Sequence, residues 1–287
     1  MSTKATIGVV SMGSMGSGIS RRLVERGAHV LTALSGRSEA SHQRARQAGV
    51  NIVTEAELVN EAELILSVVP PAASLATAQN MIPHLASRHS DITYADLNAV
   101  APATVTCIET LFDGYPVNFI DGGIIGGPPR AGAKGARIYL SGKVGKVAST
   151  LADPGLDARD MQKASGQASA LKLSYAMLTK GLMALGSMAA IRADQTDVIG
   201  ELVDELGFSQ PDMLTWFGKA LKGMPPKAYR WDGEMLEIAK FLAEIDGGET
   251  MYRSISDFYR SIAEAHNNDT PDDSITSIVN FSSQGQT

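Results

Sequence analysis

The chain opens with a residue pattern that is suited to binding phosphate. The apolar, β-branched run Thr6–Ser11 (TIGVVS) leads straight into a glycine turn and then into a helix-like segment. The N-terminus of a helix offers unpaired N–H groups and a partial positive charge, and both favour a bound phosphate. The residues of this turn that are expected to contact a dinucleotide are Ser11, Met12, Gly13, Ser14, Met15 and Gly16.

The two glycines of the turn have separate expected roles. Gly13 lets the backbone approach a pyrophosphate, and Gly16 lets the helix pack tightly on the strand. Ser11 stands where the usual Gly-x-Gly-x-x-Gly pattern has its first glycine, so the turn must tolerate a Cβ there. The alternative is an ordinary tight turn between strand and helix. The position of the turn after the first strand, in a βαβ unit of ~30 residues, favours dinucleotide binding.

The end of the second predicted strand indicates which dinucleotide is bound. NAD-specific folds place an acidic residue there to hold the ribose hydroxyls. This chain has Ser35, Arg37 and Ser38 instead, and its first carboxylate is Glu39, where the next helix should begin. An arginine fork and hydroxyls suit a 2′-phosphate, so we expect NADP rather than NAD. The alternative is that Ser38 only caps the helix and Arg37 is solvated.

Strand-like and helix-like runs alternate through the first half of the chain. This alternation predicts an α/β fold, a Rossmann-type, doubly wound parallel sheet. Thr54–Glu57 reads as a capping box at a helix start, and Pro102 suits the first turn of another helix. The predicted strands are Ile7–Val10, His29–Leu34, Leu64–Val69, Thr93–Asp96, Asn118–Asp121 and Arg137–Ser141.

Strand signals stop at Ser165, and a long helix is expected next. An apolar stripe recurs along it at alternating spacings of four and three residues, at Leu171, Tyr175, Leu178, Leu182, Leu185 and Ala189. Four further helices are predicted, at Thr196–Leu206, Pro211–Leu221, Lys227–Leu242 and Thr250–Ala265. The predicted organisation is a dinucleotide-binding domain (1–164), a long interdomain helix (165–194), an all-α substrate or dimerisation domain (195–266) and a flexible tail (267–287).

Composition excludes several classes of function. The chain has 287 residues and a formal net charge of −6, so no broad basic surface is expected to bind nucleic acid or an acidic membrane. One cysteine, Cys107, and scattered histidines give no metal-ligand spacing, and no apolar run approaches the ~20 residues that span a bilayer. The first residues run straight into a strand, so no signal peptide is expected, and we predict a cytoplasmic protein.

Five motifs follow one another along the chain: Gly13–Gly16, Val68–Pro70, Asp96–Pro102, Asp121–Gly127 and Gly166–Lys172. In this order they resemble the β-hydroxyacid dehydrogenases, which are related to 6-phosphogluconate dehydrogenase. The segment Met224–Trp231 is similar to an unassigned C-terminal domain of some phosphogluconate-dehydrogenase-like proteins. The resemblance implies further cofactor contacts at Val69, Pro70 and Asn98, and substrate contacts at Gly122, Gly123, Ile124, Ile125 and Thr179.

The catalytic lysine of the family corresponds to Lys172. Tyr175 and Thr179 follow it by three and seven residues, so all three share one face of the predicted helix. A substrate site there would meet an ammonium, a phenol and a hydroxyl. An ordinary lysine has a pKa of about 10.4, and burial would lower it toward neutrality. The alternative is a lysine that extends into solvent from an amphipathic helix.

Three departures from the family affect the expected substrate. Ile125 stands where the family has a serine that holds a carboxylate, Tyr175 replaces an asparagine, and Thr179 replaces the glutamate of the sugar-acid dehydrogenases. Neither a usual short hydroxyacid nor 6-phosphogluconate is therefore expected.

We predict an NADP-dependent oxidoreductase that transfers a hydride to or from a carbonyl or hydroxyl carbon of a small molecule. The alternatives are an imine reductase and a non-catalytic NADPH-binding sensor. Family members of this layout pair through the helical domain, so the resemblance also implies a homodimer.

Overall fold

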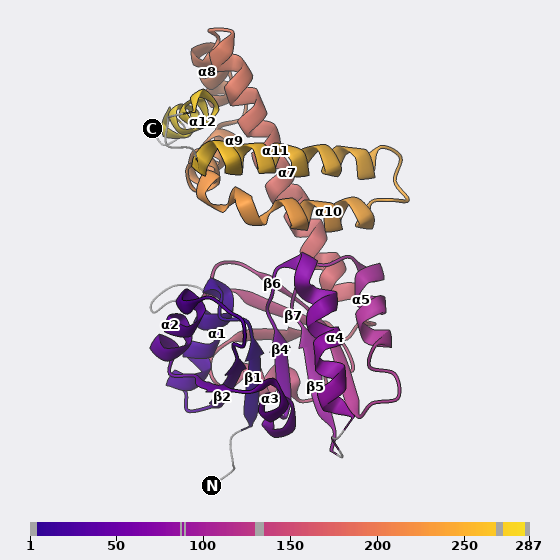
Figure 1. Ribbon diagram of the computed structural model, residues 1–287. Helices are drawn as coiled ribbons and strands as arrows, with labels where there is room; N and C mark the ends of the chain where they lie inside the picture. Colours follow the sequence, from indigo (N-terminus) through magenta and orange to yellow (C-terminus); the bar gives the residue numbers. More distant parts are fainter. Residues whose placement is uncertain (1–4, 87, 89, 130–134, 268–271, 285–287) are drawn as a thin grey trace. The chain divides into compact units, whose positions relative to one another are not determined.

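The computed structural model describes residues 5–86, 88, 90–129, 135–267 and 272–284 (Figure 1). The chain divides into two compact units, the first ending at Leu173 and the second beginning at Ser174. The division falls inside one continuous helix, α7 (Gln167–Gln195), and not at a loop. Each unit is described by itself below.

The first unit contains one sheet of eight strands. Its strand order is β3-β2-β1-β4-β5-β6-β7-β8, and the only antiparallel pair among these described strands is β6 with β7. The order reverses between β1 and β4, which is where doubly wound sheets bind dinucleotides. The strands are β1 (Thr6–Val10), β2 (His29–Ala33), β3 (Asn51–Val53), β4 (Leu64–Ser67), β5 (Ile92–Asp96), β6 (Val117–Ile125), β7 (Arg137–Gly142) and β8 (Asp157–Asp160).

Helices cover both faces of this sheet (Figure 1). Alternate strand residues supply the two cores, so that Ile7 and Val9 of β1 enter one and Val10 enters the other. On the first face lie α1 (Ser14–Glu25), α2 (Glu39–Ala48) and α6 (Val147–Ala152). On the second lie α3 (Glu55–Glu61), α4 (Ser74–Leu85) and α5 (Pro102–Thr110), with the short 3₁₀ helix η1 (Pro71–Ala73) before α4.

These elements confirm the predicted Rossmann-type fold and every predicted strand. The capping box at α3 is also confirmed, since Thr54 and Glu57 satisfy each other's backbone N–H groups. Two strands were not predicted. β3 has only three residues, and β8 has the polar sequence Asp-Ala-Arg-Asp, so neither shows an apolar run.

The second unit is helical among its described residues. After α7 come α8 (Ile199–Ser209), α9 (Pro211–Ala220), η2 (Leu221–Gly223), η3 (Pro225–Arg230), α10 (Asp232–Phe241), α11 (Gly248–Asn267) and α12 (Asp273–Gln284). The helix predicted at Lys227–Leu242 is divided: its first part is the 3₁₀ helix η3, which opens on two prolines, and α10 begins at Asp232.

The long helix α7 packs through small residues and exposes large ones. An added Cβ at Gly181 would lie 2.5 Å from the hydroxyl of Tyr252, and one at Gly186 would lie 2.5 Å from the ring of Phe217. Most of the large residues of the predicted apolar stripe are exposed to solvent in the single chain. Its exposed fractions are 61% at Leu178, 41% at Leu182 and 46% at Leu185, and Met188 beside it is 39% exposed.

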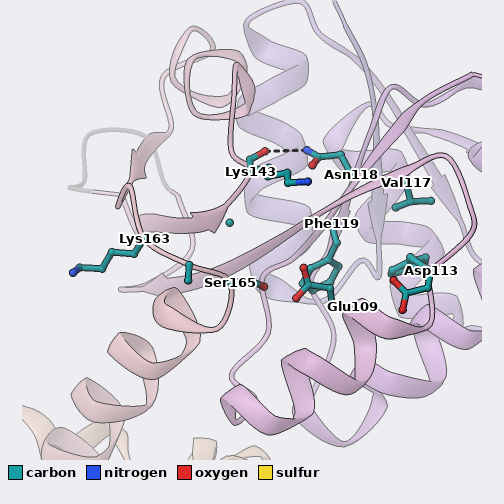
Figure 2. A pocket seen from close by; sticks show the side chains of 11 residues that line it. Glu109, Asp113, Val117, Asn118, Phe119, Lys143, Lys163 and Ser165 are labelled. Atoms are coloured by element: carbon teal, nitrogen blue, oxygen red, sulfur yellow. Dashed lines mark hydrogen bonds between the residues drawn. The ribbon is translucent and has the colours of Figure 1, made fainter.

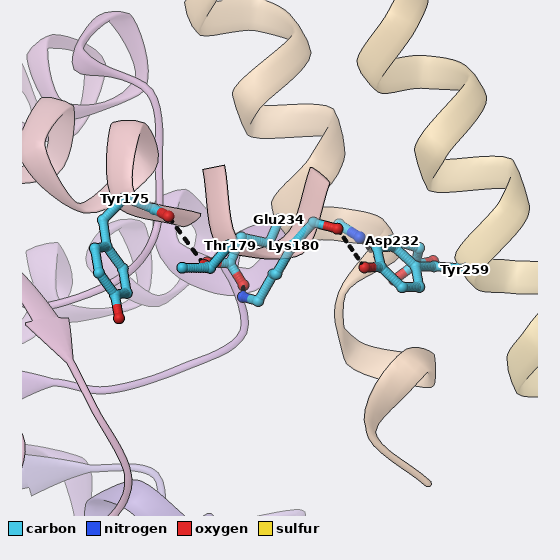
Figure 3. A network of polar contacts seen from close by, with 7 residues as sticks. Tyr175, Thr179, Lys180, Asp232, Glu234 and Tyr259 are labelled. Atoms are coloured by element: carbon cyan, nitrogen blue, oxygen red, sulfur yellow. Dashed lines mark hydrogen bonds and ion pairs between the residues drawn. The ribbon is translucent and has the colours of Figure 1, made fainter. Parts of the chain in front are cut away.

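A polar network joins three helices of this unit (Figure 3). Lys180 of α7 forms an ion pair with Glu234 in the first turn of α10, and its Nζ lies 5.1 Å from the ring centroid of Trp231. The hydroxyl of Tyr259, on α11, donates a 2.6 Å hydrogen bond to the carbonyl oxygen of Lys180. Both charged side chains are largely buried, so the pair fixes α10 against α7.

The prediction of a flexible tail from 267 is wrong for the residues described. α12 lies within it, and Ile278 and Phe281 are buried. The Phe281 ring lies 6.1 Å from that of Phe217, between ring centroids. These two apolar side chains outweigh the polar composition that suggested a loose tail. The remaining tail residues, 268–271 and 285–287, lie outside the described part of the chain.

We expect Phe281→Ala to lower the free energy of unfolding of the helical unit by about 3–5 kcal/mol, because it leaves a cavity against Phe217. Val279→Ala is the matched control, since Val279 is 40% exposed on the same helix, and should change stability by less than about 1 kcal/mol. Urea unfolding followed by circular dichroism measures both. Equal stability of the two variants would mean that α12 does not contribute to the core.

Candidate functional site

The glycine turn between β1 and α1 lies at the point where the strand order reverses. Ser11 has φ = 81°, a left-handed conformation that glycine adopts readily and serine does not. A Cβ at Gly16 would overlap the carbonyl oxygen of Ser11, so the turn closes tightly over this glycine. Ser11 and Gly16 are therefore parts of one backbone arrangement, in which the missing side chain of Gly16 leaves room for the Ser11 carbonyl.

The space around Gly13 is open, whereas Gly16 is tightly packed. A Cβ built at Gly13 would meet only the Ser11 hydroxyl oxygen, at 4.0 Å. The first intrahelical bond of α1 runs from the Ser17 N–H to the Gly13 carbonyl, so the N–H groups of the preceding turn have no helical partner. Ser14 is exposed and Met15 half-buried, whereas Met12 is buried in the core. The turn thus fits a pyrophosphate through backbone donors.

Three predicted cofactor residues follow β2, and all three are exposed: Ser35, Arg37 and Ser38. Ser38 is the N-cap residue of α2 by position, but its side chain makes no capping hydrogen bond. Its hydroxyl lies 3.2 Å from that of Ser41 instead. Glu39, the nearby carboxylate, pairs with Arg46 on the same helix. The positive and hydroxyl groups therefore face solvent without an acidic competitor at the strand end.

Arg44 was not predicted to belong to this site. Its Nε donates a hydrogen bond to the carbonyl oxygen of Met12, and its Nη2 lies 3.3 Å from the Ser41 hydroxyl. It thereby joins the glycine turn to the first turn of α2. An arginine in the middle of an amphipathic helix gives no sequence signal for such a contact, because its acceptor is a backbone atom 32 residues away.

Val69 and Asn98 are brought together where β4 and β5 end. The Val69 N–H donates to Asn98 Oδ1 at 2.7 Å, and Asn98 Nδ2 donates to the hydroxyls of Ser67 and Ser74 at 2.9 and 3.2 Å. Asn98 is buried, and both of its amide hydrogens are engaged. Its side chain therefore shapes the loop that carries Val69 and Pro70, and Pro70 is the exposed member of the group.

Asp96 is the acidic member of the same network. Ser74 donates to its Oδ2 at 2.6 Å and the Asn98 N–H donates to its Oδ1 at 3.0 Å. Burial is the main cause that raises its pKa, and the nearby carboxylate of Asp121 adds a smaller rise, while the hydrogen bonds from Ser74 and Asn98 lower it; together these effects bring the pKa to about 6. The pKa of the Asp96 carboxyl group therefore lies about one unit below neutral pH.

The predicted substrate residues of β6 are mostly interior. Gly122 lies against the Leu97 and Leu140 side chains, Ile124 belongs to the apolar core, and Ile125 is half-buried. Gly123 is different, because a Cβ there would lie 2.8 Å from the Cβ of Lys172. The glycine therefore lets the first turns of α7 lie directly on β6, and it places Lys172 against that strand.

Lys172, Tyr175 and Thr179 lie on one face of α7, as predicted. Lys172 is half-buried, whereas Tyr175 is 49% exposed. The Thr179 hydroxyl donates to the Tyr175 carbonyl oxygen at 2.9 Å, and Figure 3 shows the two residues near each other on the helix. The roles of these three residues in catalysis remain predictions.

A cavity of about 450 Å³ lies elsewhere in the first unit (Figure 2). It opens where β6 begins, whereas the residues of the glycine turn and of β2, β4 and β5 discussed above lie at or just beyond the carboxyl ends of their strands. Its lining mixes two carboxylates with two lysines, and no predicted site residue belongs to it. The lining residues are Glu109, Phe112, Asp113, Val117, Asn118, Phe119, Gly142, Lys143, Lys163, Ala164 and Ser165.

Within the described ranges, no cluster of three or more His, Cys, Asp or Glu side chains is arranged to hold a metal ion. In the same residues, no helix combines the length and apolar character needed to cross a membrane.

Two family models match the chain. Residues 6–93 match the family described as "NADP oxidoreductase coenzyme F420-dependent", and residues 193–262 match a "Domain of unknown function (DUF1932)". The first match covers the glycine turn and the ends of β2 and β4. The second covers the segment that resembles the unassigned C-terminal domain. Together with the structural matches below, they confirm the resemblance to hydroxyacid-dehydrogenase-like NAD(P)-binding proteins.

Two relatives match this chain over nearly the whole of their own length. A solved protein of unknown function, reported to be similar in structure to 3-hydroxyacid dehydrogenases, is 27% identical, with a TM-score of 0.68 over 92% of this chain and 100% of that one. An uncharacterized 28.5 kDa protein of Methanothermus fervidus is 25% identical over 90% of this chain and 99% of its own length.

More distant structures share the fold. The 3-hydroxyisobutyrate dehydrogenase of Mycobacterium tuberculosis, solved with L-serine, is 17% identical, with a TM-score of 0.71 over 96% of this chain and 98% of that one. An imine reductase of Myxococcus stipitatus, in complex with NADP+, is 18% identical, with a TM-score of 0.53 over 91% and 93% of the two chains.

The raised pKa of Asp96 predicts a pH dependence of stability. An unfolded aspartate has a pKa near 3.8 and the folded one near 6, so the folded state holds the proton more tightly between these values. The free energy of unfolding should therefore fall as pH rises from 4 to 6, by about 2 kcal/mol relative to Asp96→Asn, which does not titrate. Urea unfolding at fixed ionic strength measures this difference. Parallel pH profiles for the two proteins would contradict it.

Proposed function

We propose that this chain is an NADP-dependent oxidoreductase that interconverts a carbonyl and a hydroxyl group on a small molecule. The observation that carries the proposal is the geometry of the turn after β1. The space around Gly13 is open, Gly16 is tightly packed, and backbone N–H donors stand at the N-terminus of α1. The match of residues 6–93 to an oxidoreductase family supports it. When bound, the nicotinamide supplies or accepts the hydride.

The chain itself contributes orientation and a proton. The turn from Ser11 to Gly16 holds the pyrophosphate, and the loop that carries Val69 and Pro70 is kept in place by Asn98. Lys172 gives its Nζ proton to the carbonyl oxygen during reduction, or takes the hydroxyl proton during oxidation. Its place against Gly123 supports this role, because the lysine is fixed to the same strand that carries the predicted substrate residues.

The preference for NADP rests on the residues after β2. Arg37 and the hydroxyls of Ser35 and Ser38 face solvent, and Glu39 is paired with Arg46. A 2′-phosphate would find a guanidinium fork there and no carboxylate. The exposed free thiol of Cys107 is compatible with a reducing compartment such as the cytoplasm.

Reduction of a C=N bond is the second candidate. Similarity in fold to imine reductases and the half-exposed phenol of Tyr175 both favour it. In this case Tyr175 would be the proton donor. A lysine at position 172 favours the carbonyl reaction, because the imine reductases that share this plan usually lack it.

We further propose a homodimer formed through the exposed face of α7. Four neighbouring apolar side chains on this helix are each about 40–60% exposed, and in a single chain they would remain in water. A second copy is the fitting occupant, since a symmetric pair covers the same stripe on both chains at once.

The first test of function concerns the cofactor. NADPH should raise the melting temperature more than NADH does at equal concentration, because only NADPH carries a phosphate for Arg37. Arg37→Ala should remove most of this difference, which corresponds to about 1.5–3 kcal/mol of binding free energy. Arg21→Ala, on α1, is a control that should leave the difference unchanged. Equal stabilisation of the wild type by both cofactors would contradict NADP preference.

The second test concerns proton transfer. Lys172→Met should keep NADPH binding but lower turnover of a carbonyl substrate about 10²–10⁴-fold, the usual contribution of a positioned acid. Tyr175→Phe should cost less if the lysine is the donor and as much or more if the phenol is. NADPH oxidation with a panel of carbonyls and imines measures both. Unchanged turnover in Lys172→Met would refute the lysine mechanism, and no turnover with any compound would favour a sensor.

The third test concerns assembly. Light scattering at micromolar concentration should give the mass of a dimer, and Leu182→Glu should give that of a monomer, because it places a charge in the stripe that the proposed dimer would bury. Ile52→Glu is the control, since Ile52 is 42% exposed on β3 and lies in the other unit. A monomeric wild type would overturn the dimer.

A further inference from the structure

Asp121 stands in the middle of β6 and is fully buried. It accepts hydrogen bonds at both carboxylate oxygens. Oδ2 accepts from the Ser141 hydroxyl at 2.8 Å and from the backbone N–H groups of Ala168 and Ser169 at 3.0 and 3.1 Å. Oδ1 accepts from the Ser169 hydroxyl at 2.5 Å. All of these residues belong to the first unit.

The two N–H groups belong to the first turn of α7, where no helical carbonyl can reach them. Helices usually satisfy such groups with a capping side chain of their own. Here Gly166, which precedes the helix with φ = 89°, has no side chain to offer. A carboxylate from a distant strand does this instead, and its negative charge is favourable at the positive end of the helix.

A second contact to the same turn comes from Gly123. Asp121 and Gly123 are two residues apart on β6, so they present the same face of the strand. A Cβ at Gly123 would lie 2.9 Å from the Ala168 carbonyl oxygen and 2.8 Å from the Lys172 Cβ. The carboxylate thus holds the helix end, and the glycine provides the surface on which the next turn lies.

We propose that Asp121 is a positioning residue for Lys172. Its carboxylate sets how the first turn of α7 is rotated about the helix axis and where it lies along that axis, and so directs the lysine side chain. Ala168 and Ser169 precede Lys172 by four and three residues, so they lie one turn below it on the same side of the helix. A shift of this turn moves the lysine Nζ directly. The proposal rests on the proposed function, in which Lys172 transfers the proton.

The test is a double-mutant cycle between Asp121→Asn and Lys172→Met. The asparagine keeps the shape and one acceptor but loses the charge. Alone it should lower kcat about 10–100-fold, the cost of misplacing a catalytic group by about 1 Å, with KM for NADPH unchanged. In the Lys172→Met background it should lower the residual rate less than twofold. Equal losses in both backgrounds would mean that Asp121 acts on the fold in general, and would overturn the proposal.

Ser169→Ala provides a milder variant in case Asp121→Asn fails to fold. It removes only the bond to Oδ1, and it should give a smaller loss of kcat that also disappears when Lys172 is replaced. No loss in this variant, together with an unfolded Asp121→Asn, would contradict a positioning role.

A measurement that does not depend on enzymatic turnover distinguishes this proposal from the proposed function. The rate at which an amine-directed acylating reagent modifies Lys172, followed by mass spectrometry across a pH series, reports the surroundings of its Nζ. Asp121→Asn should change this rate at least threefold and leave that of the exposed Lys143 unchanged. An unchanged Lys172 rate would refute the positioning role. If the rate changes but Lys172→Met leaves turnover intact, the proposed function fails and the positioning remains.

Discussion

The backbone N–H groups that open α7 meet a carboxylate from the centre of the sheet, and the arrangement of the first unit depends on this contact. A buried aspartate is costly unless every oxygen is satisfied, and the Asp121 side chain receives its donors from β7 and from α7 together. β6, which has a parallel neighbour on one side and an antiparallel neighbour on the other, is thereby connected to α7, the helix that carries Lys172. Gly123 completes the contact, because any side chain at this position would push β6 and α7 apart.

Asp121 belongs to a row of buried polar residues that runs across the sheet. Ser67, Asp96, Asp121 and Ser141 are register partners on four neighbouring strands. Asp96 holds the loop after β5 through Asn98, and Asp121 holds α7. Burial raises the pKa of Asp96, and the nearby carboxylate of Asp121 adds to this rise. A sheet interior of this kind fixes loop geometry with hydrogen bonds where apolar packing would allow sliding.

The sequence predicted the fold because its signals are local. β-Branched runs mark the strands that reach the core, and the capping box and proline mark helix starts. Contacts between distant residues were not predictable in this way. Arg44 donates to a backbone carbonyl in another element, and nothing in its own helix indicates it. The spacing of apolar residues predicted the stripe on α7. Spacing identifies a stripe, whereas glycines that admit Tyr252 and Phe217 decide which face turns inward.

The position of the Asp121 donors also bears on how the chain is made. The first unit is contiguous, and its sheet is complete in sequence at Asp160, yet the N–H groups that satisfy Asp121 are eight and nine residues further on. A nascent chain that has emerged only through the last strand therefore has the Ser141 hydroxyl beside Asp121 but not the donors of Ala168 and Ser169. Domains tend to fold in order during synthesis, so this one becomes fully stable only when the first turn of α7 leaves the ribosome. An isolated fragment of the first unit must extend past that turn, because one that ended at the last strand would keep, of the donors to Asp121 described above, just the Ser141 hydroxyl.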